Sequence, residues 1–313
     1  MRYTIAVILL PVTGFILLCY HSFTATLVNH HEAALEDPSN ILLNLDNFHF
    51  VINTFPCDGH VDGPLLAVII SSDPGNLDRR KAIRQTWGGS CDTTKVVFLF
   101  GETENTTVAR TVQMESATFR DIVQGNFIDS YRNMTYKHMM GLKWATHHCP
   151  TARYVLKTDD DLFVNMGALR IFLMDKLLPR QTKNRIFCEV LSNVGVIRNV
   201  SSKWMVTMKE YPEDRYPKYC SGFSVLYTRD VVPQLLKASQ NIPLFWVDDV
   251  YITGMLAGQL LIPLEPWGTM VLSPRRANLL ISIGPSYAGD FFLGPPDISA
   301  AGIVEFWKAV YHI

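Results

Sequence analysis

Three consecutive carboxylates, Asp159, Asp160 and Asp161, are the first side chains in this sequence that indicate a chemical site. An apolar run, residues 154–156, precedes them, and a second apolar run, residues 162–164, follows. This pattern is typical of a buried strand that ends at a ligand crevice. Because neighbouring carboxylates repel each other, a half-buried set needs a compensating cation. A divalent ion that also binds phosphate oxygens meets that need, and a solvated acidic turn is the alternative.

Basic side chains follow the first long apolar run, residues 65–70. Residues 78–87 are predicted to form a helix with Asp78 as its N-cap, which places Arg80 and Arg84 on the same face. Guanidinium groups just beyond a first strand are well placed to bind a diphosphate. An ordinary solvated basic face is the alternative.

The composition sets the bounds for the class of protein. The chain has 313 residues, 48% of them hydrophobic, which is enough for one large domain or two closely packed ones. Its net charge of −1 and its pI near 6.7 give no indication of nucleic-acid binding. The sequence leaves the oligomeric state open.

The N-terminal segment indicates a membrane anchor. Residues 4–20 carry no charge, and uncharged residues continue to Asn29, a length at the short end of what spans a bilayer. A cleaved signal peptide is the alternative, but residues 19–25 offer no clean small-x-small site. We expect a single-pass type II protein. Its parts are a cytoplasmic tip and signal anchor at residues 1–28, a lumenal stem at residues 29–62 and a lumenal domain at residues 63–313.

Glycosylation sites and cysteine usage agree with a lumenal placement. Three sequons begin at Asn105, Asn133 and Asn199. Beyond the predicted anchor the chain has five cysteines, which permit two disulfides and one free thiol, and the sequence does not give the pairing. No CxxC pair occurs among them, so no structural zinc site is predicted.

Strand and helix patterns alternate through the first half of the domain. The predicted strands cover residues 65–70, 95–100 and 154–156, with a third apolar segment at residues 121–123 that leads to residues 127–131. The predicted helices cover residues 78–87, 108–119 and 136–147. This order predicts an α/β fold with a mainly parallel central sheet and helices on both faces. Residues 48–52 are expected to add an edge strand, and residues 298–311 a helix that packs on the domain. His147 and His148 are interpreted as last-turn residues that complement the helix dipole rather than as metal ligands.

Six motifs in this chain resemble those of the beta-1,3-galactosyltransferases, whose wider family includes the beta-1,3-N-acetylglucosaminyltransferases and Fringe. They occur in family order and lie within residues 48–263. The motifs are R-R-K-A-I-R-Q-T-W at 79–87, F-I-D-S-Y-R-N-M-T-Y-K at 127–137, K-T-D-D-D-L-F-V-N-M at 157–166, I-R-N-V-S-S-K-W at 197–204, Y-P-K-Y-C-S-G at 216–222 and D-D-V-Y-I-T-G at 248–254.

The resemblance implies a Golgi membrane enzyme with a nucleotide-sugar-binding, GT-A-like fold. Such an enzyme would move galactose from UDP-galactose, with inversion, to a sugar hydroxyl in beta-1,3 linkage on a glycoprotein or glycolipid, using Mn²⁺ or Mg²⁺. Transfer from UDP-N-acetylglucosamine is one alternative, and a non-catalytic lumenal member of the family is another. The motifs do not fix the donor sugar or the acceptor glycan.

The same resemblance assigns the acidic residues. Asp159 and Asp161 match the positions that serve the metal and the donor, with Asp160 at the variable middle position. Inversion by direct displacement requires a general base for the acceptor hydroxyl, and the matching carboxylate is Asp249. Asp248 stands where the family has glutamate, which keeps an acid but shortens it. The alternative role for either residue is to cap the helix that follows.

Other positions match motif residues near the donor and the acceptor. Tyr219 and Gly222 resemble the family's loop beneath donor and acceptor, although Ser224 stands where a second glycine is usual. Trp246 is a candidate either for stacking on a sugar face or for the core. The positions that match residues near the nucleotide are Arg79, Arg84, Asp129 and Lys137.

The resemblance fades after residue 263. The family carries a histidine near the C-terminus that assists the metal or the phosphates. Here the corresponding region, residues 290–294, reads D-F-F-L-G, and no histidine occurs before His312. The missing histidine raises the question of whether metal binding, and with it activity, is weakened.

Overall fold

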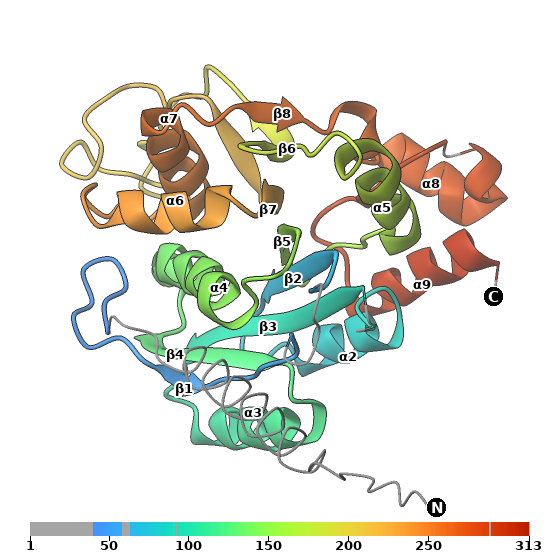
Figure 1. Cartoon of the computed structure of the whole chain (residues 1–313), viewed down its shortest axis with the longest axis horizontal. Helices are drawn as coiled ribbons and strands as arrows, with labels where there is room; N and C mark the ends of the chain where they lie inside the picture. The colour runs from blue at the N-terminus through green and yellow to red at the C-terminus, as the bar shows by residue number, and fades with distance from the viewer. Residues whose placement is uncertain (1–39, 58–62, 90, 92, 288, 313) are drawn as a thin grey trace, which may run out of the picture. The chain divides into compact units, whose positions relative to one another are not determined.

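The computed structural model describes residues 40–57, 63–89, 91, 93–287 and 289–312. Their central element is an eight-stranded sheet with the order β1-β4-β3-β2-β5-β7-β6-β8 (Figure 1). The strands are β1 Phe50–Ile52, β2 Leu66–Ser71, β3 Thr94–Glu102, β4 Ile122–Ile128, β5 Tyr154–Asp159, β6 Ile186–Leu191, β7 Tyr219–Thr228 and β8 Leu264–Pro266.

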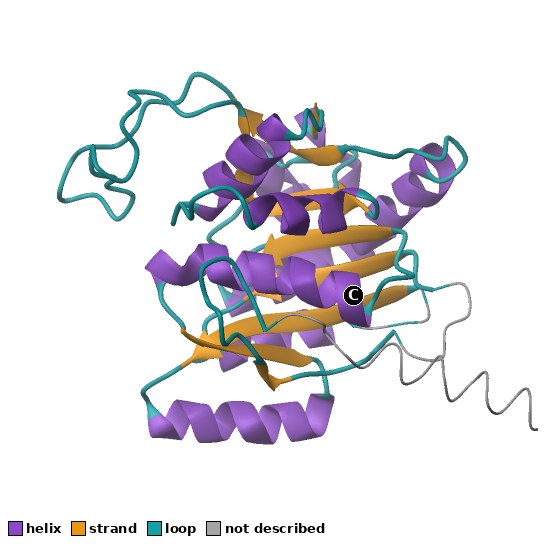
Figure 2. Cartoon of the chain, turned by 60° about the vertical axis from the view of Figure 1, so that its left-hand side comes forward, coloured by secondary structure: helices purple, strands orange, loops and turns teal. Residues whose placement is uncertain are grey.

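Helices lie in front of and behind this sheet (Figure 2). α4 packs on β2, β3, β4 and β5 and against α6, while α2 packs against α9. The longer helices are α2 Leu77–Gln85, α3 Thr106–Phe119, α4 Met134–His148, α5 Met166–Phe172, α6 Val231–Ser239, α8 Pro274–Ile283 and α9 Ala300–Tyr311. The short ones are η1 Tyr131–Asn133, α7 Ala257–Gln259, η4 Gly268–Met270, η5 Pro285–Tyr287 and the π-helices η2 Leu173–Leu177 and η3 Val250–Leu256.

The strand register places the acidic triplet at a shared edge of the sheet. β2 pairs in parallel with both β3 and β5, so Ser71 lies beside Leu99 on one side and Asp159 on the other. β7 runs antiparallel to β5, with Thr158 paired to Ser224. The residues just before Ser224 on β7 therefore reach the edge at which β5 ends.

The α/β class is confirmed, and the sheet is mixed: parallel pairings, β6 with β8 among them, are joined by antiparallel ones. β2, β3, β4 and β5 form the predicted parallel part, and β1, β6 and β7 add antiparallel pairings. A parallel strand pair requires a crossover connection, usually a helix. The chain returns from β6 to β7 without a regular helix between them, and it pairs antiparallel.

The segment before the domain packs on the sheet where the structure describes it. β1 pairs antiparallel with β4 and is the edge strand predicted from residues 48–52. Phe48 is buried in the core. The predicted anchor and the first part of the predicted stem, up to residue 39, lie outside the described residues. Among the residues that the structure describes, no helix is long and apolar enough to cross a membrane.

Several helix ends differ from the sequence-based expectation. α2 begins at Leu77 with Asn76 in the N-cap position, so Asp78 is not the cap and lies instead in the first turn, where a carboxylate complements the dipole. α3 begins at Thr106 because the side chain of Asn105 accepts hydrogen bonds from the N–H groups of Thr107 and Val108.

Two disulfides join distant parts of the chain, as the cysteine count permitted. Cys57 is bonded to Cys149, which ties the segment before β2 to the end of α4. Cys188 is bonded to Cys220 and links β6 to β7. Cys91 is an exposed free thiol.

Candidate active site

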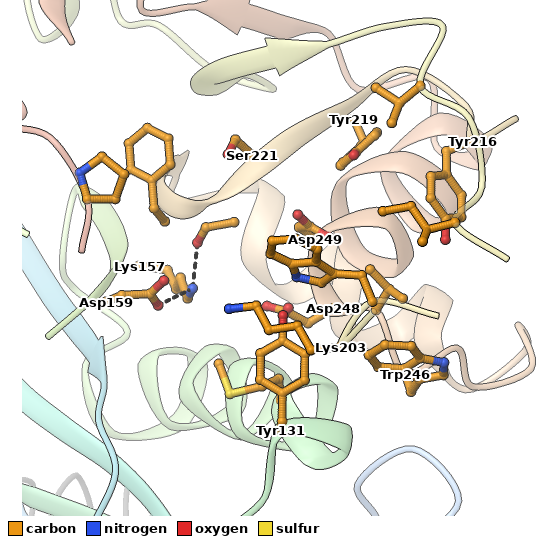
Figure 3. A pocket seen from close by; sticks show the side chains of 18 of the residues that line it. Tyr131, Lys157, Asp159, Lys203, Tyr216, Tyr219, Ser221, Trp246, Asp248 and Asp249 are labelled. Carbon is orange, nitrogen blue, oxygen red and sulfur yellow. Dashed lines mark hydrogen bonds and ion pairs between the residues drawn. The ribbon is translucent and has the colours of Figure 1, made fainter. Parts of the chain in front are cut away.

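A pocket of about 480 Å³ lies beside the carboxyl end of β5. Three parts of the chain bring carboxylates to it: Asp159 and Asp161 from β5 and the turn after it, Asp248 and Asp249 from the start of η3, and Asp297 from the C-terminal segment. Figure 3 shows Asp159 beside Lys157, with Asp248 and Asp249 together elsewhere on the wall. The volume suits a small-molecule ligand. The carboxylate side chains gathered in the lining suit a ligand that binds together with a cation.

Asp159 shares its charge with a buried lysine. Lys157 Nζ donates to Asp159 Oδ1 at 2.7 Å and to the carbonyl oxygen of Gly222 at 2.6 Å. Burial raises the pKa of Asp159 to about 6, although the charge of Lys157 opposes the change. Lys157 has no assigned role in the sequence reading. Its role could have been predicted from its spacing: Lys157 and Asp159 are two residues apart on one strand, which puts both on the same face.

Asp160 faces a different set of partners. Its carboxylate accepts hydrogen bonds from Ser72 Oγ at 2.6 Å, Asn76 Nδ2 at 2.9 Å and Arg79 Nη1 at 3.1 Å. These donors make Asp160 the member of the triplet least suited to a metal. Arg79 also lies 3.7 Å from Asp161. The structure therefore places Arg79, one of the residues predicted to lie near the nucleotide, as a partner of the triplet.

The C-terminal segment meets Asp161 directly. Ile298 N–H donates to the backbone oxygen of Asp161 at 3.0 Å, and the adjacent Asp297 lines the pocket. Burial raises the pKa of the Asp161 carboxyl, and the charges of Asp160 and Asp297 act in the same direction. The C-terminal segment, which has no histidine before His312, thus supplies the carboxylate of Asp297. The sequence analysis did not predict this residue as part of the site.

The donor atoms of this pocket suit a hard divalent ion. Asp159 and Asp161 offer carboxylate oxygens, and burial disfavours their ionised forms in the absence of a compensating charge. Mg²⁺ and similar ions are commonly held by one or two carboxylates with phosphate oxygens. Within the described ranges, no three His, Cys, Asp or Glu residues are grouped closely enough to hold a metal by themselves.

Asp249 lies at the start of η3, against the backbone of β7. Its Oδ1 accepts from the N–H of Val250 at 2.7 Å, which agrees with the capping role considered from the sequence. Burial, followed by the neighbouring charge of Asp248, raises the pKa of Asp249 to about 7. A Cβ atom at position 222 would lie 3.2 Å from Asp249 Cβ and 3.3 Å from its Oδ2, so Gly222 provides the space that Asp249 occupies.

Asp248 reaches a partner deeper in the fold. Its Oδ2 lies 2.9 Å from Nδ1 of His138, a fully buried residue of α4. His138 directly follows the motif that ends at Lys137, but the sequence does not indicate that its ring points toward Asp248. Asp248, which stands where the family has the longer glutamate, is therefore hydrogen-bonded to His138.

Asp129 and Lys137 line a smaller adjoining hollow of about 270 Å³, which shares Asp159 and Asp161 with the main pocket. Lys137 Nζ donates to Asp129 Oδ1 at 2.8 Å and to the carbonyl oxygen of Ser72 at 2.7 Å. Two of the four residues predicted to lie near the nucleotide, Asp129 and Lys137, thus lie together next to the acidic triplet.

Arg84 lies elsewhere, contrary to the expectation that it binds the donor. Its guanidinium donates to Asp121 at 2.7 and 2.9 Å and forms an ion pair with Glu115 at 2.7 Å. It also stacks over the rings of Phe98 and Phe119. Because the basic face of α2 turns toward α3, Arg84 lines neither hollow and has a structural role.

Aromatic side chains form the outer wall of the main pocket. Tyr219 and Trp246, both considered from the sequence, line it together with Tyr131 and Trp204. Arg132 lies over the Trp246 ring at 4.1 Å, so Trp246 is a packed wall residue. Rings of this kind present flat apolar faces, which suit a sugar. The position of Trp204 in this wall could not be predicted, because hydrophobic periodicity predicts strands and helices but not the path of the loop that carries Trp204.

The sequon asparagines differ in their surroundings. Asn105 and Asn199 are exposed. Asn133 is partly buried at the end of η1, and its Nδ2 donates to the carbonyl oxygen of Ile128 at 2.8 Å. Modification at these three positions stays a prediction.

The structure thus describes an α/β domain with a carboxylate-lined pocket at its strand ends. A family model described as Galactosyltransferase matches residues 78–267. Human Beta-1,3-galactosyltransferase 1 is 37% identical over 217 residues, which cover 67% of this chain and 65% of that protein. Mouse Beta-1,3-galactosyltransferase 5 is 32% identical over 252 residues, 79% of each chain.

The chain belongs to the galactosyltransferase family, as the match to its model and to these relatives shows. It covers slightly less than two thirds of the length of Beta-1,3-galactosyltransferase 1. A solved structure of galactosyltransferase LgtC with donor and acceptor sugar analogues is similar at a TM-score of 0.38 and 10% identity, over 79% of this chain and 96% of that one.

Proposed function

We propose that this chain is an inverting beta-1,3-galactosyltransferase. It moves galactose from UDP-galactose to a sugar hydroxyl on a glycoprotein or glycolipid glycan, within a GT-A-like nucleotide-sugar-binding fold. The observation that carries the proposal is the pocket itself. In a family member related to two beta-1,3-galactosyltransferases, one pocket holds both a carboxylate with a raised pKa, Asp249, and the pair Asp159 and Asp161.

Asp249 acts as the general base in this account. It accepts the proton of the acceptor hydroxyl while the hydroxyl oxygen bonds to the anomeric carbon of galactose. The bond between that carbon and the UDP oxygen breaks, and UDP leaves with the electron pair. Attack opposite the leaving group inverts the anomeric configuration. A base is most effective when its pKa lies near the working pH, and the pKa of about 7 for Asp249 meets this condition.

Side chains of the site would hold a metal ion and the donor in this account. Asp159 and Asp161 would hold Mn²⁺ or Mg²⁺ together with the diphosphate, and the ion would supply positive charge to offset the charge on departing UDP. Lys157 fixes Asp159 and, through the carbonyl of Gly222, holds β7 beside it. Lys137 and Asp129 shape the adjoining hollow, where the nucleotide is expected to bind.

The compartment belongs to the same proposal. We place the domain in the Golgi lumen behind a single-pass type II anchor within residues 1–28. Two disulfides agree with an oxidising compartment, because such bonds rarely persist in the cytosol.

Parallel donor assays test the proposal. The full-length chain is incubated with Mn²⁺, an acceptor panel ending in N-acetylhexosamine or hexose, and either UDP-galactose or UDP-N-acetylglucosamine, and the product mass is measured. We expect a hexose increment that EDTA abolishes. An N-acetylhexosamine increment alone would replace the donor, and tight UDP binding without any product would indicate a non-catalytic family member.

A further inference from the structure

Three buried side chains from three elements form a hydrogen-bonded chain behind Asp249. The Tyr227 hydroxyl, on β7, lies 3.0 Å from Nε2 of His138, on α4. His138 Nδ1 lies 2.9 Å from Oδ2 of Asp248, the residue before Asp249. Tyr227 and His138 are both 0% exposed, so water does not compete for these contacts.

The direction of the hydrogen bonds follows from the chemistry of the three groups. Burial raises the pKa of Tyr227 well above its ordinary value, so the hydroxyl keeps its proton at neutral pH and donates it to Nε2. Burial lowers the pKa of His138, so the ring is neutral. A neutral imidazole that accepts at Nε2 carries its hydrogen on Nδ1. His138 therefore donates to Asp248.

This donor keeps Asp248 ionised in a place that disfavours charge. Burial alone raises the pKa of Asp248, but the His138 hydrogen bond and the charge of Lys157 together bring it below its ordinary value. Asp249 lies next in the chain, and the anionic Asp248 helps to raise its pKa. The other titratable groups that face this acid pair are Lys157 and Asp159 on β5, Tyr219 and Tyr227 on β7, and Tyr131 and Tyr216 from the loops.

We propose that Asp248, His138 and Tyr227 are positioning residues for the reaction, which hold a permanent negative charge behind Asp249 and thereby strengthen it as a base. The proposal rests on the proposed function, because it concerns the same carboxylate. The hydrogen-bonded chain of Tyr227, His138 and Asp248, called the relay below, moves no proton itself.

Two substitutions of His138 test the relay. His138→Asn keeps an amide N–H near the position of Nδ1, whereas His138→Leu removes the donor. In the leucine variant Asp248 loses the donor that keeps it ionised, so the repulsion that raises the pKa of Asp249 weakens. We therefore expect the acidic limb of kcat/KM to move down by about one to two pH units, the size of a lost hydrogen bond to a charged group. The asparagine variant should bring the limb back, and the KM for UDP-galactose should stay within about threefold in both.

Two buried tyrosines offer a matched pair. Tyr227→Phe removes the hydroxyl that fixes the tautomer, and we expect a smaller shift in the same direction. Tyr251→Phe removes a buried hydroxyl that donates to the carbonyl oxygen of Ile242, outside the relay, and should leave the limb in place. Equal limbs in the leucine variant and the unsubstituted chain would overturn the proposal, as would equal shifts in both phenylalanine variants.

A measurement without turnover separates this proposal from the proposed function. In the ¹⁵N-histidine-labelled full-length chain, we expect one neutral ring with its hydrogen on Nδ1 that does not titrate between about pH 5.5 and 8. Its resonance should vanish in His138→Asn. An Nε2–H tautomer or a titrating ring at this position would overturn the relay even if galactose is transferred. Absent transfer with the expected resonance would overturn only the proposed function.

Discussion

At the scale of single residues, Asp249 has surroundings that work against its own charge. Its pKa rises from 3.8 to about 7 because it is buried and lies beside the ionised Asp248. A carboxyl that binds its proton more tightly when folded than when unfolded lowers stability as the pH rises between those two values. The burial and repulsion that raise the pKa of Asp249, on which its proposed role as a base depends, therefore lower the stability of the fold at neutral pH.

Substitution of Asp249 should reveal this cost. We expect Asp249→Asn to melt at a higher temperature than the unsubstituted chain, with a difference that grows from about pH 4 to pH 7 and is then constant. A difference of several degrees is expected, since about 1 kcal/mol shifts Tm by about 2–4 °C in a domain of this size. Thermal denaturation across pH measures it, with the exposed Asp175→Asn as control. A pH-independent difference would contradict the burial argument.

The residues of the pocket were accessible to sequence reasoning to different degrees. Asp159, Asp161 and Asp249 are carboxylates at motif positions, and the structure brings all three to one pocket. His138 lies 110 residues from Asp248 and 89 from Tyr227. Contacts over such separations depend on how α4 packs on the sheet, which local patterns do not specify.

At the scale of elements, the basic face of α2 binds protein carboxylates. Arg80 and Arg84 both reach Glu115 on α3, and Arg80 is 0% exposed. Removing one partner of a buried ion pair leaves an uncompensated charge. The α2–α3 contact is therefore expected to be a stabilising feature of this side of the sheet, independent of the donor.

Arg84→Ala separates this role from donor binding. We expect the free energy of unfolding to fall by about 3 kcal/mol or more, because Glu115 and Asp121 lose a shared partner, while the KM for UDP-galactose is unchanged. Denaturant unfolding and donor kinetics measure the two effects. The control is Lys81→Ala, whose ion pair with Asp78 is largely exposed and worth less than about 1 kcal/mol. Unchanged stability with a raised KM would restore the donor role.

Elements with a strong pattern were predictable, and those defined by tertiary contacts were not. The apolar runs of β2, β3 and β5 predicted buried parallel strands, and the partial alternation in residues 48–52 predicted the edge strand. The antiparallel pairing of β7 could not be predicted in the same way, because the apolar pattern of a buried strand does not show in which direction the strand runs. The π-helix η3 begins at the acid pair, and no periodicity predicts such a local widening.

At the scale of the whole molecule, one disulfide ties the segment before β2 to the rest of the domain. Cys57 and Cys149 are 92 residues apart in sequence, so their bond closes a long loop. Such a bond limits the freedom of the unfolded chain. The cysteine count predicted two bridges and one free thiol, but the pairing required the fold.

Loss of this bridge should be costly, and loss of the free thiol should not. We expect Cys57→Ser to lower the free energy of unfolding by about 2–5 kcal/mol, measured by denaturant unfolding without reductant. Cys91→Ser, at the exposed free cysteine, should leave stability unchanged within about 0.5 kcal/mol. Equal effects of the two substitutions would show that the long bridge does not constrain the chain.

The rate of galactose transfer by Asp249→Asn, compared with the unsubstituted full-length chain, tests the central claim most directly. With Mn²⁺, UDP-galactose and a glycan acceptor, we expect kcat to fall about 10²–10⁴-fold, the usual contribution of a general base. The KM for UDP-galactose should change little, because the proposed function assigns donor binding to other side chains. Transfer by the asparagine variant at the unsubstituted rate would contradict the account.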